Sequence, residues 1–209
     1  MNGPVTAGHT VDGEYLDLTL GGFLDLIAAR QPAPGAGAAA AVTVAMAAGL
    51  VSMAARYSGD RLEQAEDVAA RAETLRRRSA PLAQADARAY QRVIEAMALP
   101  SELGAEARAS RRQAIRRALE GAADVPLQIA EIGADVAELA ATVAESGNPN
   151  LRGDGITAGL LAASATRSAA VLVGINVGDR DERTLQAVRL AETATAAAQR
   201  AATADLERR

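Results

Sequence analysis

Two side chains that could do chemistry stand one helical turn apart in the middle of the chain. Asp86 and Tyr90 continue an apolar stripe with spacings of three and four that runs through Leu82. A carboxylate on such an inward face loses water, which raises its pKa unless a positive charge or donors compensate. It then suits proton transfer near neutral pH or stabilisation of a cation. A structural ion pair, with Arg167 as a partner, is the alternative that the residues leave open.

A second polar group follows in residues 146–155, which read Ser-Gly-Asn-Pro-Asn-Leu-Arg-Gly-Asp-Gly. Asp154 directly precedes an apolar stretch, where aspartate commonly caps a helix by accepting a backbone N–H. Capping and ligand binding both fit this position. Within the apolar stretch 156–177, Arg167 is the only charge and Asn176 is an amide. Buried polar groups need partners, so we expect both to be paired.

The third candidate is a loop at residues 32–37, Pro-Ala-Pro-Gly-Ala-Gly. Prolines followed by glycines do not propagate a helix, so this segment is expected to be a tight turn. The next residues, 38–55, carry no charge and favour a helix. Backbone N–H groups at the start of such a helix can bind an anion or a polar ring edge, and glycine admits close approach. On the local sequence alone, an ordinary connection before a core helix is favoured over a ligand loop, because a short Gly-rich turn is a weak motif.

The composition excludes several kinds of site. The chain has no cysteine and a single histidine, His9. These counts exclude a thiol nucleophile, a disulfide framework, a His-cluster metal site and a Ser-His-Asp triad. The net charge of −4 argues against nucleic acid as a partner. We therefore expect no metal, and chemistry that uses carboxylates, arginines, amides and backbone.

The elements that position these groups are expected to be helices. The chain of 209 residues is 49% hydrophobic and 2% aromatic, and apolar residues recur at spacings of three and four without alternating stretches. We predict an all-α antiparallel bundle in which two central Ala-rich helices, 38–55 and 156–177, are buried all round. Neither helix has the interfacial aromatics of a membrane span, and no signal-peptide pattern is seen. The protein is expected to be cytoplasmic, without a membrane partner.

The remaining elements are expected around these two helices. Residues 1–14 should form a flexible tail, and residues 15–209 one domain. Pro81 should kink or restart its helix, and Pro126 should mark another kink. The arginine- and glutamate-rich segment 102–120 is interpreted as a solvated helix face. A short amphipathic helix ending near residue 30, a helix ending at Leu99-Pro100 and a final helix over 181–208 complete the prediction.

The loop at residues 32–37 resembles the Pro-x-Pro-Gly-Gly-Gly-Ser signature of the formiminotetrahydrofolate cyclodeaminase / methenyltetrahydrofolate cyclohydrolase family. Here Ala36 replaces the middle glycine and Ala38 the serine. The segment from Gln84 to Tyr90 is similar to the family's Asp-x-Asp-x-x-Ala-Phe. Asp86 matches its second acid and Tyr90 its aromatic residue, while Gln84 replaces the first acid.

Two further segments carry the resemblance, which covers nearly the whole chain in order. Gly147-Asn148 and Asp154 match the family's Gly-Asn…Ser-Asp loop, with Gly153 in place of the serine. Ile175-Asn176 fits the second half of an Asn-Val-x-Ile-Asn pattern.

The resemblance implies an all-helical homodimer that binds folate in a cleft that includes the 32–37 loop. It implies hydrolysis of 5,10-methenyltetrahydrofolate to 10-formyltetrahydrofolate, or cyclodeamination of 5-formiminotetrahydrofolate with release of ammonia. No cofactor beyond the tetrahydrofolate substrate is expected. A non-catalytic folate-binding or structural helical dimer is the alternative, because most motifs carry a substitution. The expected catalytic residues are Asp86 and Asp154, and the expected substrate-binding residues are Pro34, Gly35, Gly37, Tyr90, Asn148, Arg152 and Asn176.

Overall fold

The computed structural model describes residues 14–100 and 104–204, and this part of the chain contains helices and no strand. The all-α prediction is therefore confirmed, whereas residues 1–13 of the expected tail lie outside the described residues. Three 3-10 turns lie at Tyr15–Asp17, Gly59–Arg61 and Pro149–Leu151. The α-helices are α1 (Leu20–Ala28), α2 (Ala36–Arg56), α3 (Ala65–Ser79), α4 (Leu82–Ala98), α5 (Gly104–Ser146), α6 (Arg152–Val177) and α7 (Glu182–Thr203).

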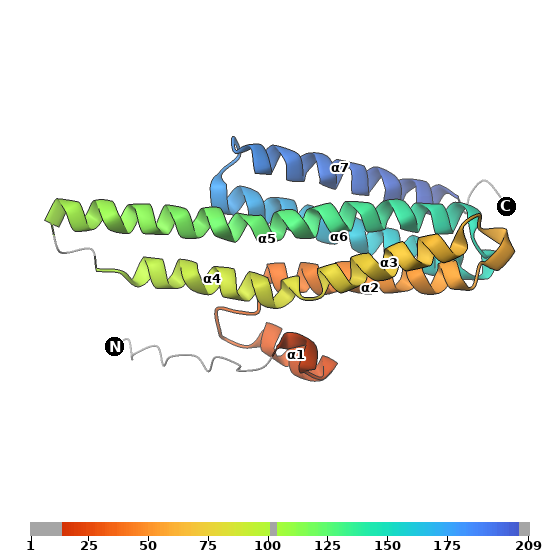
Figure 1. Cartoon of the computed structure of the whole chain (residues 1–209), viewed down its shortest axis with the longest axis horizontal. Coiled ribbons are helices and arrows are strands. Elements are labelled where there is room, and N and C mark those ends of the chain that lie inside the picture. Colours follow the sequence, from red (N-terminus) through yellow and green to blue (C-terminus); the bar gives the residue numbers. More distant parts are fainter. Residues whose placement is uncertain (1–13, 101–103, 205–209) are drawn as a thin grey trace.

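Helices α2–α7 lie nearly parallel to one long axis, α5 runs the whole length of the molecule, and the short α1 lies outside this bundle (Figure 1). α3 and α4 follow one another along one side, and α7 lies on α6 (Figure 1). Small residues at the contacts let the helices approach closely. A Cβ at Gly133 of α5, for example, would overlap the hydroxyl of Thr166 on α6. The core is consequently built mainly of alanine and valine rather than of large side chains.

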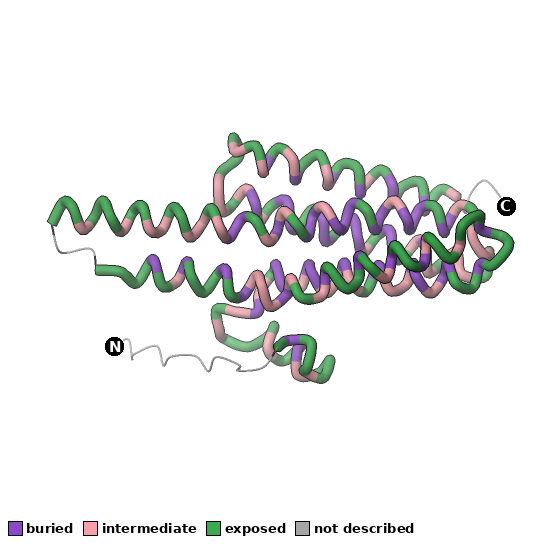
Figure 2. Tube along the Cα trace, in the orientation of Figure 1, coloured by how far each residue is buried: buried purple, intermediate pink, exposed green. Residues whose placement is uncertain are grey.

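The prediction that α2 and the α6 region are buried all round is wrong. Both helices are long and apolar enough to cross a membrane, yet only 56% and 50% of their apolar windows are buried in the bundle. Met46 on α2 and Val171 and Ile175 on α6 are exposed, and exposed and half-buried positions recur along the outside of the bundle (Figure 2). α2 packs against α3, α4, α5 and α6, and α6 packs against α2, α5 and α7, but one strip of each helix is left without a neighbour within the chain.

The two central prolines behave differently. α3 ends at Ser79 and α4 begins at Leu82, so Pro81 does break the helix as predicted. Pro126, by contrast, lies fully buried inside α5, which continues through it. The last helix ends at Thr203 in the structure rather than near residue 208, and residues 205–209 are not described.

The bundle has two distinct ends. At one end lie the N-terminus of α2 and the C-terminus of α6, and the α4–α5 hairpin projects beyond them (Figure 1). We call this the Asp86 end, because Asp86 of α4 lies against the start of α2. At the other end, which we call the Asn148 end, Asn148 before α6 contacts Tyr57 after α2. The predicted site residues form two groups, one at each of these ends.

Candidate active site

Asp86 and the first turn of α2 form the centre of the Asp86 end. The Asp86 carboxylate accepts a hydrogen bond from the backbone N–H of Ala38. A Cβ built on Gly37 would overlap the carboxyl carbon and both oxygens of Asp86. The carboxylate thus occupies the space that a side chain at position 37 would fill. The close approach of Asp86 to α2 therefore requires glycine at this position. Gly35 is the N-cap of α2 and leaves open space beside it.

Asp86 is poorly solvated, and no positively charged side chain of the described residues is paired with it. Burial raises the pKa of the Asp86 carboxyl to about 6, while the Ala38 N–H acts in the opposite direction by favouring the ionised form. Arg167 lies on the exposed side of α6, lining a groove with α7. The alternative in which Arg167 and Asp86 form a buried ion pair is therefore wrong. Asp86 remains a carboxylate that can exchange a proton near neutral pH.

Tyr15 also belongs to this site, although the sequence reasoning did not single it out. Its backbone N–H donates to the Gln84 side-chain oxygen at 3.1 Å, and its ring meets Phe23 edge-on, with centroids 5.9 Å apart. Burial and the negative charge of Asp86 both raise the pKa of the Tyr15 phenol. The phenol is therefore protonated when Asp86 is ionised. No spacing rule links Tyr15 to residues about seventy positions further along the chain.

Tyr90 lies at the edge of the core rather than within it. The stripe that carries Asp86 is covered by α2, but α4 continues past the start of α2, and Tyr90 is 47% exposed. Ala89 and Val93 on the adjoining face remain buried against Ala122 of α5. Tyr90 therefore presents an accessible aromatic face one turn from Asp86, as stacking against a flat ring would need.

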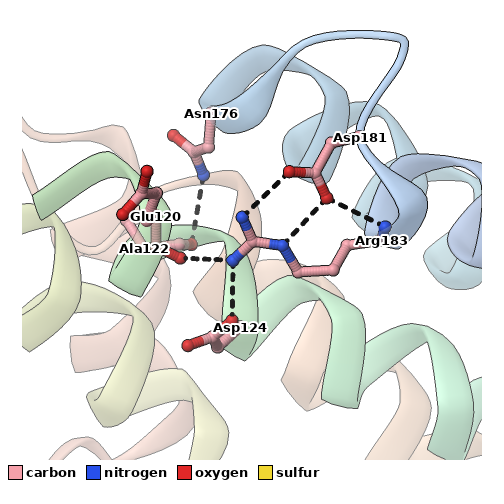
Figure 3. A network of polar contacts seen from close by, with 6 residues as sticks. All are labelled: Glu120, Ala122, Asp124, Asn176, Asp181 and Arg183. Carbon is pink, nitrogen blue, oxygen red and sulfur yellow. Dashed lines mark hydrogen bonds and ion pairs between the residues drawn. The ribbon is translucent and has the colours of Figure 1, made fainter. Parts of the chain in front are cut away.

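Asn176 also lies at the Asp86 end and is fixed to α5. Its side-chain N–H donates to the Ala122 carbonyl at 3.1 Å. Beside it, the Arg183 guanidinium is bonded to both oxygens of Asp181, at 3.0 and 3.1 Å, within the start of α7 (Figure 3). Arg183 also donates to the Glu120 carbonyl at 2.9 Å and to Asp124 at 3.1 Å, and these two contacts tie the start of α7 to α5. The residues next to Asn176 are thereby held in place.

A surface pocket of about 500 Å³ adjoins this network. It lies between the projecting part of α5 and the end of α6. A larger groove of about 850 Å³ between α6 and α7 contains none of the predicted catalytic or substrate-binding residues. Among the described residues, no group of histidine, aspartate or glutamate side chains is arranged to hold a metal ion. The smaller pocket is lined by Arg112, Ile115, Arg116, Leu119, Glu120, Asn176, Val177 and Asp181.

At the Asn148 end, the Asn148 side chain is used within the fold. Its amide N–H donates to the Tyr57 carbonyl at 3.0 Å, and its oxygen accepts the Asn150 N–H at 3.1 Å. Its backbone N–H donates to the Ser58 hydroxyl at 2.9 Å. A Cβ on Gly147 would approach that hydroxyl to 2.8 Å, so glycine is required for this contact. Asn148 thus joins the loop to the end of α2.

Asp154 and Arg152 both lie in the first turn of α6. Of the two roles that the sequence leaves open for Asp154, helix capping is wrong, because α6 begins at Arg152 and its N-cap is Leu151. The 3-10 turn before it runs straight into α6, which shifts the start of the helix towards the N-terminus. Asp154 is partly buried and still benefits from the positive end of the helix dipole.

Within one chain, the Asp86 end and the Asn148 end lie far apart. Asp154 and Asn176 are 22 residues apart on the continuous helix α6, which corresponds to about 33 Å. The structure therefore brings together Pro34, Gly35, Gly37, Asp86, Tyr90 and Asn176 at one end, and Asn148, Arg152 and Asp154 at the other.

Comparison with known proteins tests the resemblance. Residues 19–205 match the sequence profile of a family described as formiminotransferase-cyclodeaminase. A methenyltetrahydrofolate cyclohydrolase from Methylorubrum extorquens is 37% identical over 180 residues, covering 83% of this chain and 86% of the relative. A formimidoyltransferase-cyclodeaminase from Sus scrofa is 35% identical over 142 residues, which are 63% of this chain but 25% of that longer protein.

Solved structures agree with the sequence comparison. The crystal structure of formiminotetrahydrofolate cyclodeaminase from Thermotoga maritima superimposes with a TM-score of 0.78 and 26% sequence identity, covering 91% of this chain and 97% of that one. The predicted resemblance is confirmed over most of the sequence and most of the fold. The chain belongs to the formiminotransferase-cyclodeaminase family.

Proposed function

We propose that this protein is a methenyltetrahydrofolate cyclohydrolase, which hydrolyses 5,10-methenyltetrahydrofolate to 10-formyltetrahydrofolate in the cytoplasm. The observation that carries the proposal is the poorly solvated Asp86 carboxylate, seated against Gly37 with a pKa of about 6. The cyclohydrolase relative, which aligns over most of both chains, favours this reaction. Cyclodeamination of 5-formiminotetrahydrofolate is the second candidate, supported by the superimposed Thermotoga enzyme.

Asp86 would serve the reaction in two ways. Its negative charge favours the cationic methenyl carbon that bridges N5 and N10 of the substrate. As water adds to this carbon, Asp86 accepts one proton and then returns it to N5 while the C–N5 bond breaks. The proton of the new hydroxyl leaves to solvent as the formyl C=O forms, so the overall reaction releases one proton. The chemistry needs no cofactor beyond the folate.

The neighbours of Asp86 would position the substrate. The Tyr90 ring offers a stacking surface for the flat ring system, because it is accessible one turn from Asp86. Residues 34–37 would contribute backbone at the start of α2, where N–H groups are free of intrahelical partners. Asn176 would contribute its amide oxygen, since its N–H is already bonded to Ala122.

The Asn148 end would reach the site only from a second subunit. We propose a homodimer in which the exposed, largely apolar faces of α2 and α6 pair, with a two-fold axis across the helices. Such pairing runs the helices antiparallel, so that Asp154 and Arg152 of one subunit approach Asp86 of the other. The support is the exposure of Met46 and Val171 on helices that carry almost no charge.

The test is a spectroscopic assay that follows loss of the methenyl chromophore in the presence of the purified protein. Catalysed loss above the buffer rate supports the proposal. A protein that shifts its melting temperature with folate but leaves the methenyl compound intact is a binding protein, and the enzyme proposal is then wrong. Assay of 5-formiminotetrahydrofolate in parallel, by ammonia release, separates the two reactions.

A further inference from the structure

The arginines near the start of α5, in the part that projects beyond the ends of α2 and α6, differ in their contacts. Arg111 donates to the Leu99 carbonyl at 2.9 Å and to the Met97 carbonyl at 2.7 Å, and so ties the end of α4 to α5. Arg112 and Arg116, one turn apart, both line the 500 Å³ pocket beside Asn176. Arg117 is exposed and lines neither pocket described above. The segment is therefore not the uniform solvated face that its sequence indicates.

The pocket combines a positive rim with an apolar surface. Ile115 and Leu119, half-buried on the same helix, supply the apolar part. Within residues 14–100 and 104–204, neither Arg112 nor Arg116 has a hydrogen bond or an ion pair with the protein. Two planar guanidinium groups at this spacing suit carboxylates, which they bind through paired N–H donors.

Two acids also line the pocket, but they do not neutralise these arginines. Both oxygens of Asp181 are bonded to Arg183. Glu120 forms no ion pair with either pocket arginine in the described part of the chain, although its backbone carbonyl accepts from Arg183. Arg112 and Arg116 consequently remain available to an anionic group of a ligand.

The rise of the helices gives the offset between Asp86 and the pocket along the axis of the bundle. Ala89, one turn from Asp86, belongs to the group of side chains packed on Ala122 of α5, whose carbonyl accepts the bond from Asn176. α4 and α5 run antiparallel (Figure 1), so Asp86 is level with a residue about one turn beyond Ala122. At a rise of 1.5 Å per residue, Arg116 is then offset from Asp86 by about 14 Å along the helix axis, and Arg112 by about 20 Å.

We propose that Arg112 and Arg116 bind the carboxylates of the glutamate tail of the folate, an inference that rests on the function proposed above. A benzoyl ring and an amide separate the reacting carbon from the tail, so the catalytic acid and the tail site must lie well apart, as they do here. The benzoyl ring would lie along Leu119 and Ile115. Arg116 would meet the first glutamate, and Arg112, one turn further out, would meet additional glutamates.

The first test uses binding alone. Isothermal titration with p-aminobenzoyl-triglutamate, which carries the tail but no reacting carbon, should show binding to the wild-type protein. Arg112→Gln and Arg116→Gln should each weaken it by about 10-fold or more, the usual effect of losing a hydrogen bond between charged groups. Arg117→Gln, on the same helix and equally exposed, is the matched control and should bind as the wild type does. Equal binding by all four proteins, or none by the wild type, overturns the proposal.

The second test separates this inference from the proposed function. With methenyltetrahydrofolate triglutamate, the two variants should raise KM by about 10-fold or more with kcat nearly unchanged, because a uniform binding contact is lost. With the analogue that lacks glutamate, the KM of each variant should equal the KM of the wild type. A wild type that turns over the substrate while both variants keep its KM overturns the tail site alone. Tail binding without turnover contradicts the proposed reaction and leaves the pocket assignment intact.

Discussion

The Asp86 carboxylate fills the space that a side chain at position 37 would need, while the next residue of α2, Ala38, donates its backbone N–H to the same group. Position 37 therefore controls where the carboxylate lies, although Gly37 has no functional group of its own. Glycine here serves a close approach between two helices rather than an unusual backbone angle.

Gly37→Ala should displace Asp86 and strongly reduce activity. The new methyl group would overlap all three carboxyl atoms, so the carboxylate must rotate away from Ala38. We expect kcat/KM to fall by about 100-fold or more, in the range for loss of a positioned acid–base group. Gly121→Ala in α5, where a Cβ meets nothing within 4 Å, is the matched control. Full activity of Gly37→Ala would contradict the assignment of Asp86.

Asp86→Asn should separate function from stability. The amide keeps the shape but cannot accept a proton, so turnover should fall about 100- to 10,000-fold. Because burial raises the pKa of Asp86 from 3.8 to about 6, the ionised carboxylate destabilises the fold above that pH. The variant should be more stable than the wild type at pH 8, by roughly 1–3 kcal/mol. Chemical denaturation measures this difference, and a large loss of stability would indicate a structural role instead.

The pH dependence of the wild type follows from the same pKa. The folded protein binds more protons at Asp86 than the unfolded chain between about pH 4 and 6, so this residue's contribution to stability decreases as the pH rises through that window. Activity should change in the opposite direction. If ionised Asp86 is the base, kcat/KM should rise with pH and level off above an apparent pKa near 6. A profile that is flat from pH 5 to 8 would exclude Asp86 as the titrating base.

The exposed apolar face of α6 provides a test of the dimer. Val171 is 62% exposed, so Val171→Glu should leave the monomer fold intact but place a charge in the proposed interface. Analytical ultracentrifugation at micromolar concentration should show a dimer for the wild type and dissociation for the variant. Gln113→Glu, an equal change of charge on the exposed part of α5, should remain dimeric. A wild-type monomer would contradict the proposed assembly.

Mixed dimers test whether the two ends form one site. If Asp86 of one subunit acts with Asp154 of the other, Asp86→Asn and Asp154→Asn should each be inactive alone. After the two variants are mixed, unfolded and refolded together, heterodimers contain one site with both native aspartates. Activity should then recover to about a quarter of the wild-type value, because half of the dimers are mixed and each restores one of two sites. No recovery would show that the ends act independently.

Some properties of this protein can be predicted from the sequence because they are local. The spacing of apolar residues predicts helices, and the break at Pro81 follows from a missing N–H. The stripe through Leu82 correctly places Asp86 on an inward-facing side, since a helical period fixes which residues share a face. The absence of cysteine and the single histidine limit the chemistry without any structure.

Other properties depend on contacts between distant segments, which periodicity does not encode. Only the tertiary structure places Asp86 against Gly37 and Tyr15 rather than against Arg167. It also determines that the two groups of motif residues lie at opposite ends of α6, because motif order along the chain carries no information about distance. The roles of the α5 arginines also depend on contacts between distant segments. Helical spacing indicates which of these residues share a face, but whether a neighbouring helix covers that face depends on where α2 and α6 end.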